Sequence, residues 1–350
     1  MGRHPGQFEP VVCVTGQHRN MLDQVLQAFH VKPQIDLNLM QPGQTLFGST
    51  SRILASLEQV FADLKPDMTV VQGDTTTTFT GALASFYAKV PIAHVEAGLR
   101  TFDLQQPFPE EAYRVLTARI ATLHLAATEG AAQNLRRENV DPETIFVTGN
   151  TGIDAILFIK EELEAGRLHG LAWPHLDPSK KLILVTAHRR ENHGQGFVNI
   201  CQALLQLADR DDVQFVYPVH PNPQVQQPVN QALGGHPNIH LCPPLDYIPF
   251  VDLMRRAYLL ITDSGGVQEE GPSLGKPILV LREKTERPEA VEAGTVQLVG
   301  TNPDRIIAAA EHLLNHPETR QAMTRIHNPY GDGHASARIC TAINQYFASR

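Results

Sequence analysis

Glycines and glutamates follow a buried apolar run in the stretch TDSGGVQEEGPSLGKP, residues 262–277. Ser264 is a good helix N-cap, and Gly265 and Gly266 would open the helix without side chains in front of its N–H groups. A phosphate could then approach these N–H groups, and Glu270, one turn after Gly266, could accept hydrogen bonds from two vicinal hydroxyls. A capped helix with acidic residues near its start is an equally good interpretation of this stretch alone.

Three further polar motifs carry carboxylates beside predicted strands or at a helix start. Asp74 lies in VVQGDTTTT, Glu96 in HVEAGLRTFD and Glu110 in QPFPEEAYR. The structural interpretations are a helix cap, an ion-pair partner of Arg100 and an acidic residue in a first helical turn, respectively. His94 and Glu96 could bind a metal, but they lack a third ligand, so the sequence predicts no metal site.

Cations and imidazoles gather in two motifs of the second half of the sequence. TAHRREN contains His188, Arg189 and Arg190, and YPVHPNP contains His220 after another predicted strand. Two cations and an imidazole suit a diphosphate and an acid–base role, whereas a surface ion-pair cluster with Glu191 is the structural alternative. No P-loop is present, and GDGHAS lacks both the last glycine and the strand of a dinucleotide fingerprint. A nicotinamide or flavin cofactor is therefore not expected.

The motifs fall between short apolar runs that alternate with amphipathic stretches. Such alternation of apolar strands and helices predicts parallel sheets covered on both faces, so we expect an α/β fold with two doubly wound Rossmann-like domains and a cleft between them. The loop-like segment 164–181 is the predicted boundary between domains at 1–165 and 180–334. Ligands of such sheets bind at the carboxyl ends of the strands, where the polar motifs lie. The predicted strands are 11–14, 69–72, 92–95, 123–126, 145–147, 182–185, 213–218, 239–242, 258–261 and 277–281.

The composition is that of an ordinary globular protein. The 350 residues include 29 Lys and Arg against 37 Asp and Glu, a net charge of −8, without any stretch dense in Lys or Arg. Neither nucleic acid nor an anionic membrane is therefore an expected partner. The four cysteines are far apart and lack metal-like spacing, which favours free thiols in a reducing compartment. No membrane-spanning run or signal peptide is evident, so we expect a cytoplasmic location.

Taken together, the motifs resemble one family closely, the bacterial non-hydrolysing UDP-N-acetylglucosamine 2-epimerases. The resemblance implies a GT-B-like fold in which a final helix, 335–350, crosses back to the first domain. It also implies a homodimer that interconverts UDP-GlcNAc and UDP-ManNAc without a cofactor. The matching stretches run in order along nearly the whole sequence: TGQHRNMLDQVL, MQPGQTL, VVQGDTTTT, HVEAGLRTFD, PFPEEAYR, VTGNTGIDA, TAHRREN, PVHPNP, TDSGGVQEEGPSLGKP, TERPEA and NPYGDGHAS.

The resemblance also assigns roles to individual residues. The acid–base carboxylates fall on Asp74, Glu96 and Glu110, with His188 as a partner. The residues that bind UDP fall on Ser264, Gly265, Gly266, Glu270, Arg189 and His220. Of these, the serine and the glycines hold the phosphates, and the glutamate binds the ribose. In many members a second UDP-GlcNAc binds nearby as an activator, and the matching positions include Gln17, Arg52 and Arg190.

The chemistry explains the need for several carboxylates. The C2 proton of UDP-GlcNAc is adjacent to an amide nitrogen rather than a carbonyl, so simple deprotonation has no enolate to stabilise it. If the C1–O bond to UDP breaks first, C1 becomes oxocarbenium-like and the C2 proton becomes acidic. Elimination gives a glycal and UDP, and re-addition with protonation from the other face inverts C2. This route needs acid–base groups on opposite faces and a firm hold on UDP.

Other functions of the same fold remain open from the sequence. A hydrolysing 2-epimerase would release ManNAc and UDP, although the SGG and HRRE patterns fit the non-hydrolysing branch better. A UDP-sugar-binding protein without turnover is a second alternative from a different class. A retaining glycosyltransferase would leave the constellation of Asp74, Glu96 and Glu110 without a purpose.

The start of the sequence departs from the family pattern. Family members begin with a strand, a Phe-Gly-Thr-Arg-Pro-Glu loop and a lysine-bearing helix, and GRHPGQFEP resembles the end of that helix. The resemblance therefore predicts that most of a β–α unit, roughly 20–25 residues, is absent. We expect a chain without this unit to lose a central strand of the first sheet, with low stability, little epimerase activity and weak UDP binding through the second domain.

Overall fold

The computed structural model describes residues 1, 6–16, 19–41, 43–285 and 287–349. The chain divides into two compact units, Met1–Asp154 with Gly333–Arg350 (unit 1) and Ala155–Asp332 (unit 2). This division precedes the loop at 164–181 that the sequence favours as a boundary. The loop is instead tied to unit 2, because the side chain of Gln214 accepts a hydrogen bond from Asp177 N at 2.9 Å and donates one to Asp177 O at 2.6 Å.

Unit 2 contains one parallel sheet of six strands in the order β12-β11-β10-β7-β8-β9. The strand order reverses between β7 and β10, which is where doubly wound sheets bind ligands beyond their carboxyl ends. The strands are β7 (Lys181–Thr186), β8 (Val213–Pro218), β9 (Ile239–Cys242), β10 (Leu259–Thr262), β11 (Ile278–Val280) and β12 (Val296–Leu298). The last of these was missed by the sequence prediction because VQL is only three residues long and has a polar centre.

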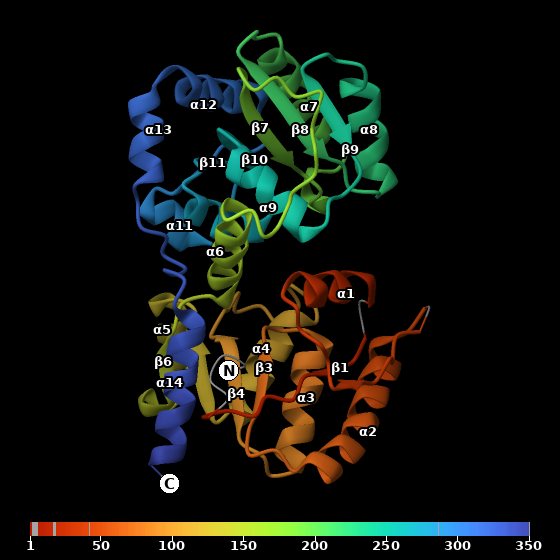
Figure 1. Ribbon diagram of the computed structural model, residues 1–350, viewed down its shortest axis with the longest axis vertical. Coiled ribbons are helices and arrows are strands. Elements are labelled where there is room, and N and C mark those ends of the chain that lie inside the picture. Colours follow the sequence, from red (N-terminus) through yellow and green to blue (C-terminus); the bar gives the residue numbers. More distant parts are fainter. Residues whose placement is uncertain (2–5, 17–18, 42, 286, 350) are drawn as a thin grey trace. The chain divides into compact units, whose positions relative to one another are not determined.

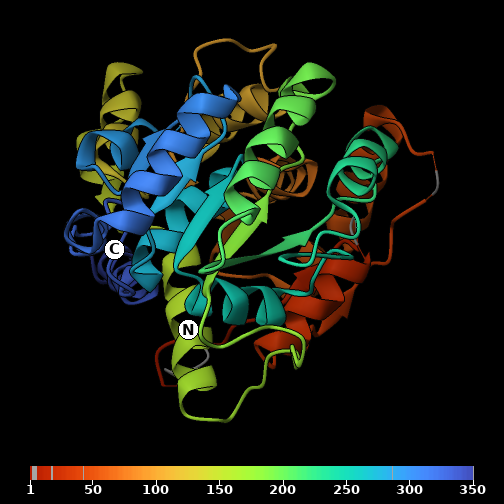
Figure 2. The same ribbon diagram turned by 90° about the horizontal axis from the view of Figure 1, so that it is seen from above.

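Helices cover both faces of the unit 2 sheet. Its largest core cluster joins α7 (Gln195–Ala208), α8 (Pro223–Leu233) and α12 (Pro303–Asn315) to alternate strand residues such as Phe215 and Ile261. Figure 2 shows α7 in green and α12 in blue lying side by side over the sheet. The other helices of the unit are α9 (Tyr247–Arg256), α10 (Gly265–Glu270), α11 (Pro288–Ala293) and α13 (Pro317–Thr324), with 3₁₀ turns η2 (Arg190–Asn192) and η3 (Gly271–Leu274).

Unit 1 holds two separate parallel sheets. The larger has the order β3-β4-β5-β6 and the smaller pairs β1 with β2. Helix α3 lies beneath both sheets, because Ala82 packs on Val71 of β3 and Ala84 packs in the cluster that contains Cys13 of β1. The strands are β1 (Cys13–Val14), β2 (Ile35–Asp36), β3 (Thr69–Gln72), β4 (Ile92–Ala97), β5 (Leu123–Ala126) and β6 (Ile145–Val147). The two-residue β2 was not predicted, because it is too short to show a periodic pattern.

The remaining helices of unit 1 position the ends of these strands. Helices α3 and α4 pack against each other, and Phe79 of α3 stacks on Tyr113 of α4 with ring centroids 5.0 Å apart. The helices are α1 (Arg19–Ala28), α2 (Leu46–Leu64), α3 (Thr76–Tyr87), α4 (Glu110–Ile120), α5 (Glu129–Arg137), the 3₁₀ turn η1 (Pro142–Thr144) and α14 (Ala335–Ala348), while α6 (Thr151–Glu164) spans the division between the units.

The C-terminal helix α14 completes the core of unit 1, as Figure 1 shows. Its residues Ile339 and Ile343 pack on Val95 and Leu125 of the four-stranded sheet. Asp154 holds the start of the helix, since its carboxylate accepts hydrogen bonds from Ala335 N at 3.1 Å and Ser336 N at 2.8 Å. This contact joins segments far apart in the sequence and satisfies N–H groups that have no partner within the helix.

No helix in the described part of the chain is long and apolar enough to cross a membrane. The cysteines Cys13, Cys201, Cys242 and Cys340 are all free thiols.

We predict that Asp154→Ala loosens α14 by about 0.5–2 kcal/mol, the usual effect of removing a side-chain cap. Amide hydrogen exchange followed by mass spectrometry should show that the substitution speeds exchange in residues 335–348 more than in the strands of unit 2. Asp63→Ala is a matched control, because Asp63 is an exposed carboxylate that accepts a hydrogen bond from the side chain of Gln59. Equal exchange in α14 of both variants would contradict the capping role.

Candidate active site

Asp263 joins the two loops that follow β7 and β10 at the reversal point of the unit 2 sheet. Its carboxylate is fully buried and accepts hydrogen bonds from His188 N at 2.9 and 3.1 Å, Arg189 N at 2.8 Å and Asn192 Nδ2 at 3.0 Å. A buried carboxylate needs such donors to offset the loss of water. Asp263 therefore fixes the backbone of the HRREN loop beside the start of α10. Asp263 was not predicted as a site residue.

The structure brings together two histidines that the sequence singled out. The rings of His188 and His220 stack with centroids 5.5 Å apart and an interplanar angle of 21°. Burial lowers the pKa of His188, Asp263 opposes this effect, and the charges of His220 and Arg189 lower the pKa further. A lowered pKa keeps the imidazole of His188 neutral at pH 7, so that one ring nitrogen can accept a proton.

The start of α10 is open to an anion. Ser264 is the N-cap residue, as predicted, but its side chain makes no capping hydrogen bond. The predicted position of the helix start is therefore confirmed, whereas a side-chain cap is not present at Ser264. Its backbone N–H instead donates to Thr262 Oγ1 at 2.9 Å. Gly266 is exposed, and a Cβ there would find only Ser264 Oγ within 4 Å, at 3.9 Å. The glycine thus leaves room for a ligand close to the backbone.

Two adjacent glutamates at the end of α10 have opposite surroundings. Glu269 forms an ion pair with Arg287, and its carbonyl accepts a hydrogen bond from Asn328 Nδ2 at 2.7 Å. Glu270 is half-buried, and burial together with the charge of Glu269 raises its pKa to about 8. Arg287 and Asn328 come from the motifs TERPEA and NPYGDGHAS, and neither was predicted as a site residue.

In unit 1 the strand β4 is distorted at Glu96. The register with β5 shifts between Val95 and Ala97, so Glu96 is the extra residue of a β-bulge, with a φ of +64°. Bulges re-aim side chains, and a left-handed conformation at a residue other than glycine costs about 1–3 kcal/mol. Gly73 in the neighbouring loop has a φ of +74°, and a Cβ there would lie 3.8 Å from Glu96 Oε2. The bulge thus brings Glu96 beside the loop that carries Asp74.

His94 supports this loop from inside the core. It is fully buried and forms a hydrogen bond of 2.8 Å from Nε2 to the carbonyl of Gly73. Burial lowers its pKa to about 4, so the imidazole is neutral and donates the hydrogen through Nε2. Arg100 pairs with Glu138 at 2.6 Å, and the proposed ion pair between Arg100 and Glu96 is therefore wrong.

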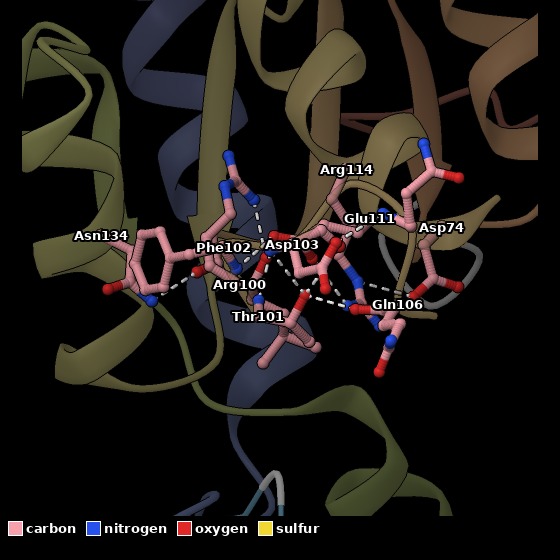
Figure 3. Close-up of polar contacts among 12 residues, drawn as sticks. Asp74, Arg100, Thr101, Phe102, Asp103, Gln106, Glu111, Arg114 and Asn134 are labelled. Atoms are coloured by element: carbon pink, nitrogen blue, oxygen red, sulfur yellow. Dashed lines mark hydrogen bonds and ion pairs between the residues drawn. The ribbon is translucent and has the colours of Figure 1, made fainter. Parts of the chain in front are cut away.

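Arg114 links Asp74 to Glu111, as Figure 3 shows. Its Nη2 lies 2.7 Å from Asp74 Oδ2 and its Nη1 lies 3.0 Å from Glu111 Oε2. Glu110 begins α4 one turn before Arg114, and residues four apart lie on the same face of a helix. Asp74, Glu111 and Arg114 therefore meet at the carboxyl edge of the unit 1 sheet, and Glu110 lies on the same face of α4 as Arg114. Arg114 was missed as a site residue, although its spacing from two glutamates in PFPEEAYR was visible.

The residues predicted to bind an activator are only partly described. Gln17 lies outside the described residues. Arg52 on α2 donates a hydrogen bond of 2.8 Å from Nη2 to Gln44 Oε1, and Arg190 is exposed in η2. No group of three His, Cys, Asp or Glu side chains that could hold a metal ion occurs among the residues that the structure describes.

Comparisons with known proteins agree on one family. Residues 2–344 match the family described as UDP-N-acetylglucosamine 2-epimerase. The chain is 56% identical over 347 residues to UDP-N-acetylglucosamine 2-epimerase of Salmonella typhimurium, covering 98% of this chain and 92% of that protein. It is 55% identical over 341 residues to the protein of the same name from Escherichia coli strain K12, covering 96% and 91%, respectively.

Solved structures of similar proteins show the same fold. One is UDP-GlcNAc 2-epimerase from Neisseria meningitidis bound to UDP-GlcNAc, with 47% identity, a TM-score of 0.86 and coverage of 97% of this chain and 92% of that one. Another is the Methanocaldococcus jannaschii enzyme in complex with UDP-GlcNAc and UDP, with 34% identity, a TM-score of 0.76 and coverage of 96% and 91%. The predicted GT-B-like α/β fold is confirmed. The chain belongs to the UDP-N-acetylglucosamine 2-epimerase family, whose members are isomerases.

Proposed function

We propose that this chain interconverts UDP-GlcNAc and UDP-ManNAc by inverting the configuration at C2 of the sugar. Family membership and the epimerase names of the relatives support this reaction. The observation that carries it is that Glu96 lies beside the loop of Asp74, and that Arg114, one turn after Glu110 on α4, contacts Asp74; these carboxylates could serve in proton transfer. UDP-GlcNAc and UDP are the ligands in two of the related structures.

The proposed reaction proceeds by elimination and re-addition. The C1–O bond to UDP breaks with its electron pair leaving on the phosphate, and a carboxylate removes the C2 proton to give the glycal. The phosphate oxygen then attacks C1 again while a second acid delivers a proton to the other face of C2. Every heavy atom of the substrate returns to the product, and the C2 proton taken by the first carboxylate is replaced by one from the second acid. Proton transfer by a positioned side chain is worth about 10²–10⁴ in rate.

The residues divide between proton transfer and UDP binding. We assign proton transfer to Asp74, Glu96 and Glu110, and the neutral imidazole of His188 is suited to accept or pass on a proton. We assign the diphosphate to the N–H groups around Ser264, Gly265 and Gly266 and to Arg189 and His220, since stabilising the departing phosphate requires fixed positive dipoles and charges. Glu270 would bind the ribose. Its raised pKa favours a carboxylic acid that can both donate and accept a hydrogen bond.

The hydrolysing reaction is the second candidate. It would release ManNAc and UDP, because water rather than UDP would add to C1. An assay for free ManNAc distinguishes the two reactions. A chain that binds UDP-sugars without turnover would give neither product.

We also propose a homodimer and an activator site. Exposed apolar side chains on α3 and α4 support self-association: Phe86, Tyr87 and Leu116 are 55%, 65% and 48% exposed, respectively, on two helices that pack together. Apolar side chains that gather on a surface are typical of protein interfaces. A second UDP-GlcNAc would bind as activator near Gln17, Arg52 and Arg190, and the free thiols agree with the expected cytoplasmic location.

A reaction run in D2O tests the proposed route. We expect UDP-ManNAc formed from UDP-GlcNAc to carry deuterium at C2, without added nicotinamide or metal, because the departing proton exchanges with solvent. NMR of the purified product measures the isotope. Product that retains hydrogen at C2 would rule out exchange of this proton.

Substitutions should separate chemistry from UDP binding. Asp74→Asn and Glu110→Gln are expected to lower kcat by about 100-fold or more while UDP affinity stays nearly unchanged. Ser264→Ala and Glu270→Ala should mainly weaken UDP, by about 1–3 kcal/mol each. Steady-state kinetics and UDP titration measure both effects. If Asp74→Asn turned over at the wild-type rate, Asp74 would be only a structural residue of its loop.

The raised pKa of Glu270 predicts a pH-dependent stability. Between its ordinary pKa of 4.5 and about 8, Glu270 keeps its proton in the folded state and loses it on unfolding. Stability should therefore fall as pH rises through this window. Glutamine does not titrate, so Glu270→Gln should not lose stability in this way. The melting temperature of the variant relative to that of the wild type should therefore rise by a few degrees between pH 5 and pH 8.5, at about 2–4 °C per kcal/mol. A difference that stays constant with pH would contradict the assignment.

A further inference from the structure

We propose that Arg114 and Glu111 are positioning residues that fix Asp74 for proton transfer and leave its Oδ1 as the reacting atom. This inference rests on the role proposed above for Asp74. Both contacts from Arg114 reach the same oxygen, with Nε at 2.9 Å and Nη2 at 2.7 Å from Asp74 Oδ2. In the described part of the chain, Oδ1 has no hydrogen bond or ion pair, so it is the oxygen available to a substrate.

Glu111 anchors the guanidinium from the other side. The residue is fully buried, and its Oε2 accepts Arg114 Nη1 at 3.0 Å. Its Oε1 accepts the backbone N–H groups of Thr101 and Phe102 at 2.9 and 3.0 Å. All the hydrogen bonds of the carboxylate are therefore made within the protein, which leaves little freedom for the arginine that it holds.

The loop before α4 is part of the same network, as Figure 3 shows. Phe102 adopts a φ of +65°, a conformation that is unusual for a bulky residue and that Glu111 holds through the Phe102 N–H. Thr101 Oγ1 donates to Gln106 O at 2.5 Å and closes the loop on itself. The loop, the first turn of α4 and Asp74 are thus connected through one carboxylate and one guanidinium.

The charges explain why a cation is needed here. Asp74 and Glu111 are two carboxylates that approach the same place, and Arg114 is placed between them. Without Arg114, the two negative charges would repel each other, and Asp74 would turn toward solvent. A displacement of about 1 Å at a reacting group typically costs about 100-fold in rate. Since UDP binding is assigned to unit 2, the loss should appear in kcat rather than in UDP affinity.

The test compares Arg114→Ala with Arg119→Ala, a matched change of an exposed arginine on the same helix. We expect Arg114→Ala to lower kcat by about 100-fold, with KM and UDP affinity nearly unchanged. Millimolar guanidinium should restore part of kcat in a saturable way, and Arg114→Lys should be intermediate. The isotope effect with substrate deuterated at C2 should rise in Arg114→Ala, because proton transfer becomes slower than the other steps. Arg119→Ala should behave as wild type.

Glu111→Gln keeps the inference testable if Arg114→Ala does not fold. This nearly isosteric change removes the charge that holds Arg114 and should also lower kcat without changing UDP affinity. Wild-type kcat in Glu111→Gln, or in folded Arg114→Ala, would overturn the inference. Guanidinium should not rescue Asp74→Asn. If Asp74→Asn is itself active, the proposed role of Asp74 fails; if it is inactive while Arg114→Ala is active, only the positioning role fails.

Discussion

Both units depend on buried carboxylates that satisfy backbone N–H groups where strands end. Parallel sheets bring the carboxyl ends of their strands to one edge, and the chain there leaves the ladder with unpaired polar groups. In unit 2, Asp263 takes up the N–H groups of His188 and Arg189. In unit 1, Glu111 does the same for Thr101 and Phe102. Each carboxylate thereby sets the course of a loop that carries candidate site residues.

The loops held by Asp263 and by Glu111 affect different candidate site residues. Asp263 lies at the reversal point of a six-stranded sheet, and its contacts place His188 against His220. Glu111 acts through an arginine, so its effect reaches a second carboxylate, Asp74. The bulge at Glu96 adds a strained residue to the same edge. Strain of this kind persists only where surrounding contacts over-determine the conformation, and it often accompanies function.

The sequence predicted the regular parts of the molecule well. Runs such as TVVQ, LHLA and IHLC coincide with β3, β5 and β9, because short apolar runs between helical stretches have few alternatives. The motifs also placed Ser264 at a helix start and Asp74 directly after a strand. Periodicity could not reveal pairings that depend on side-chain reach, such as Arg114 with Asp74 or Arg100 with Glu138. Composition likewise could not show that the loop at 164–181 is bound to the unit 2 sheet, because this contact depends on the side chain of Gln214.

Burial and pairing together sort the charges of the candidate site residues within each unit. Carboxylates that meet an arginine, Asp74 with Arg114 and Glu269 with Arg287, keep a partner for their negative charge. Groups buried without such a partner are held neutral instead: burial lowers the pKa of His94 to about 4 and raises that of Glu270 to about 8. Neutral and charged groups therefore stand next to each other at fixed positions, as between Glu269 and Glu270. An elimination that moves a proton and a phosphate needs this separation, because the base must be ionised while neighbouring donors keep their protons. The two arginines thus fix where the negative charges of Asp74 and Glu269 lie, apart from the neighbouring groups that burial holds neutral.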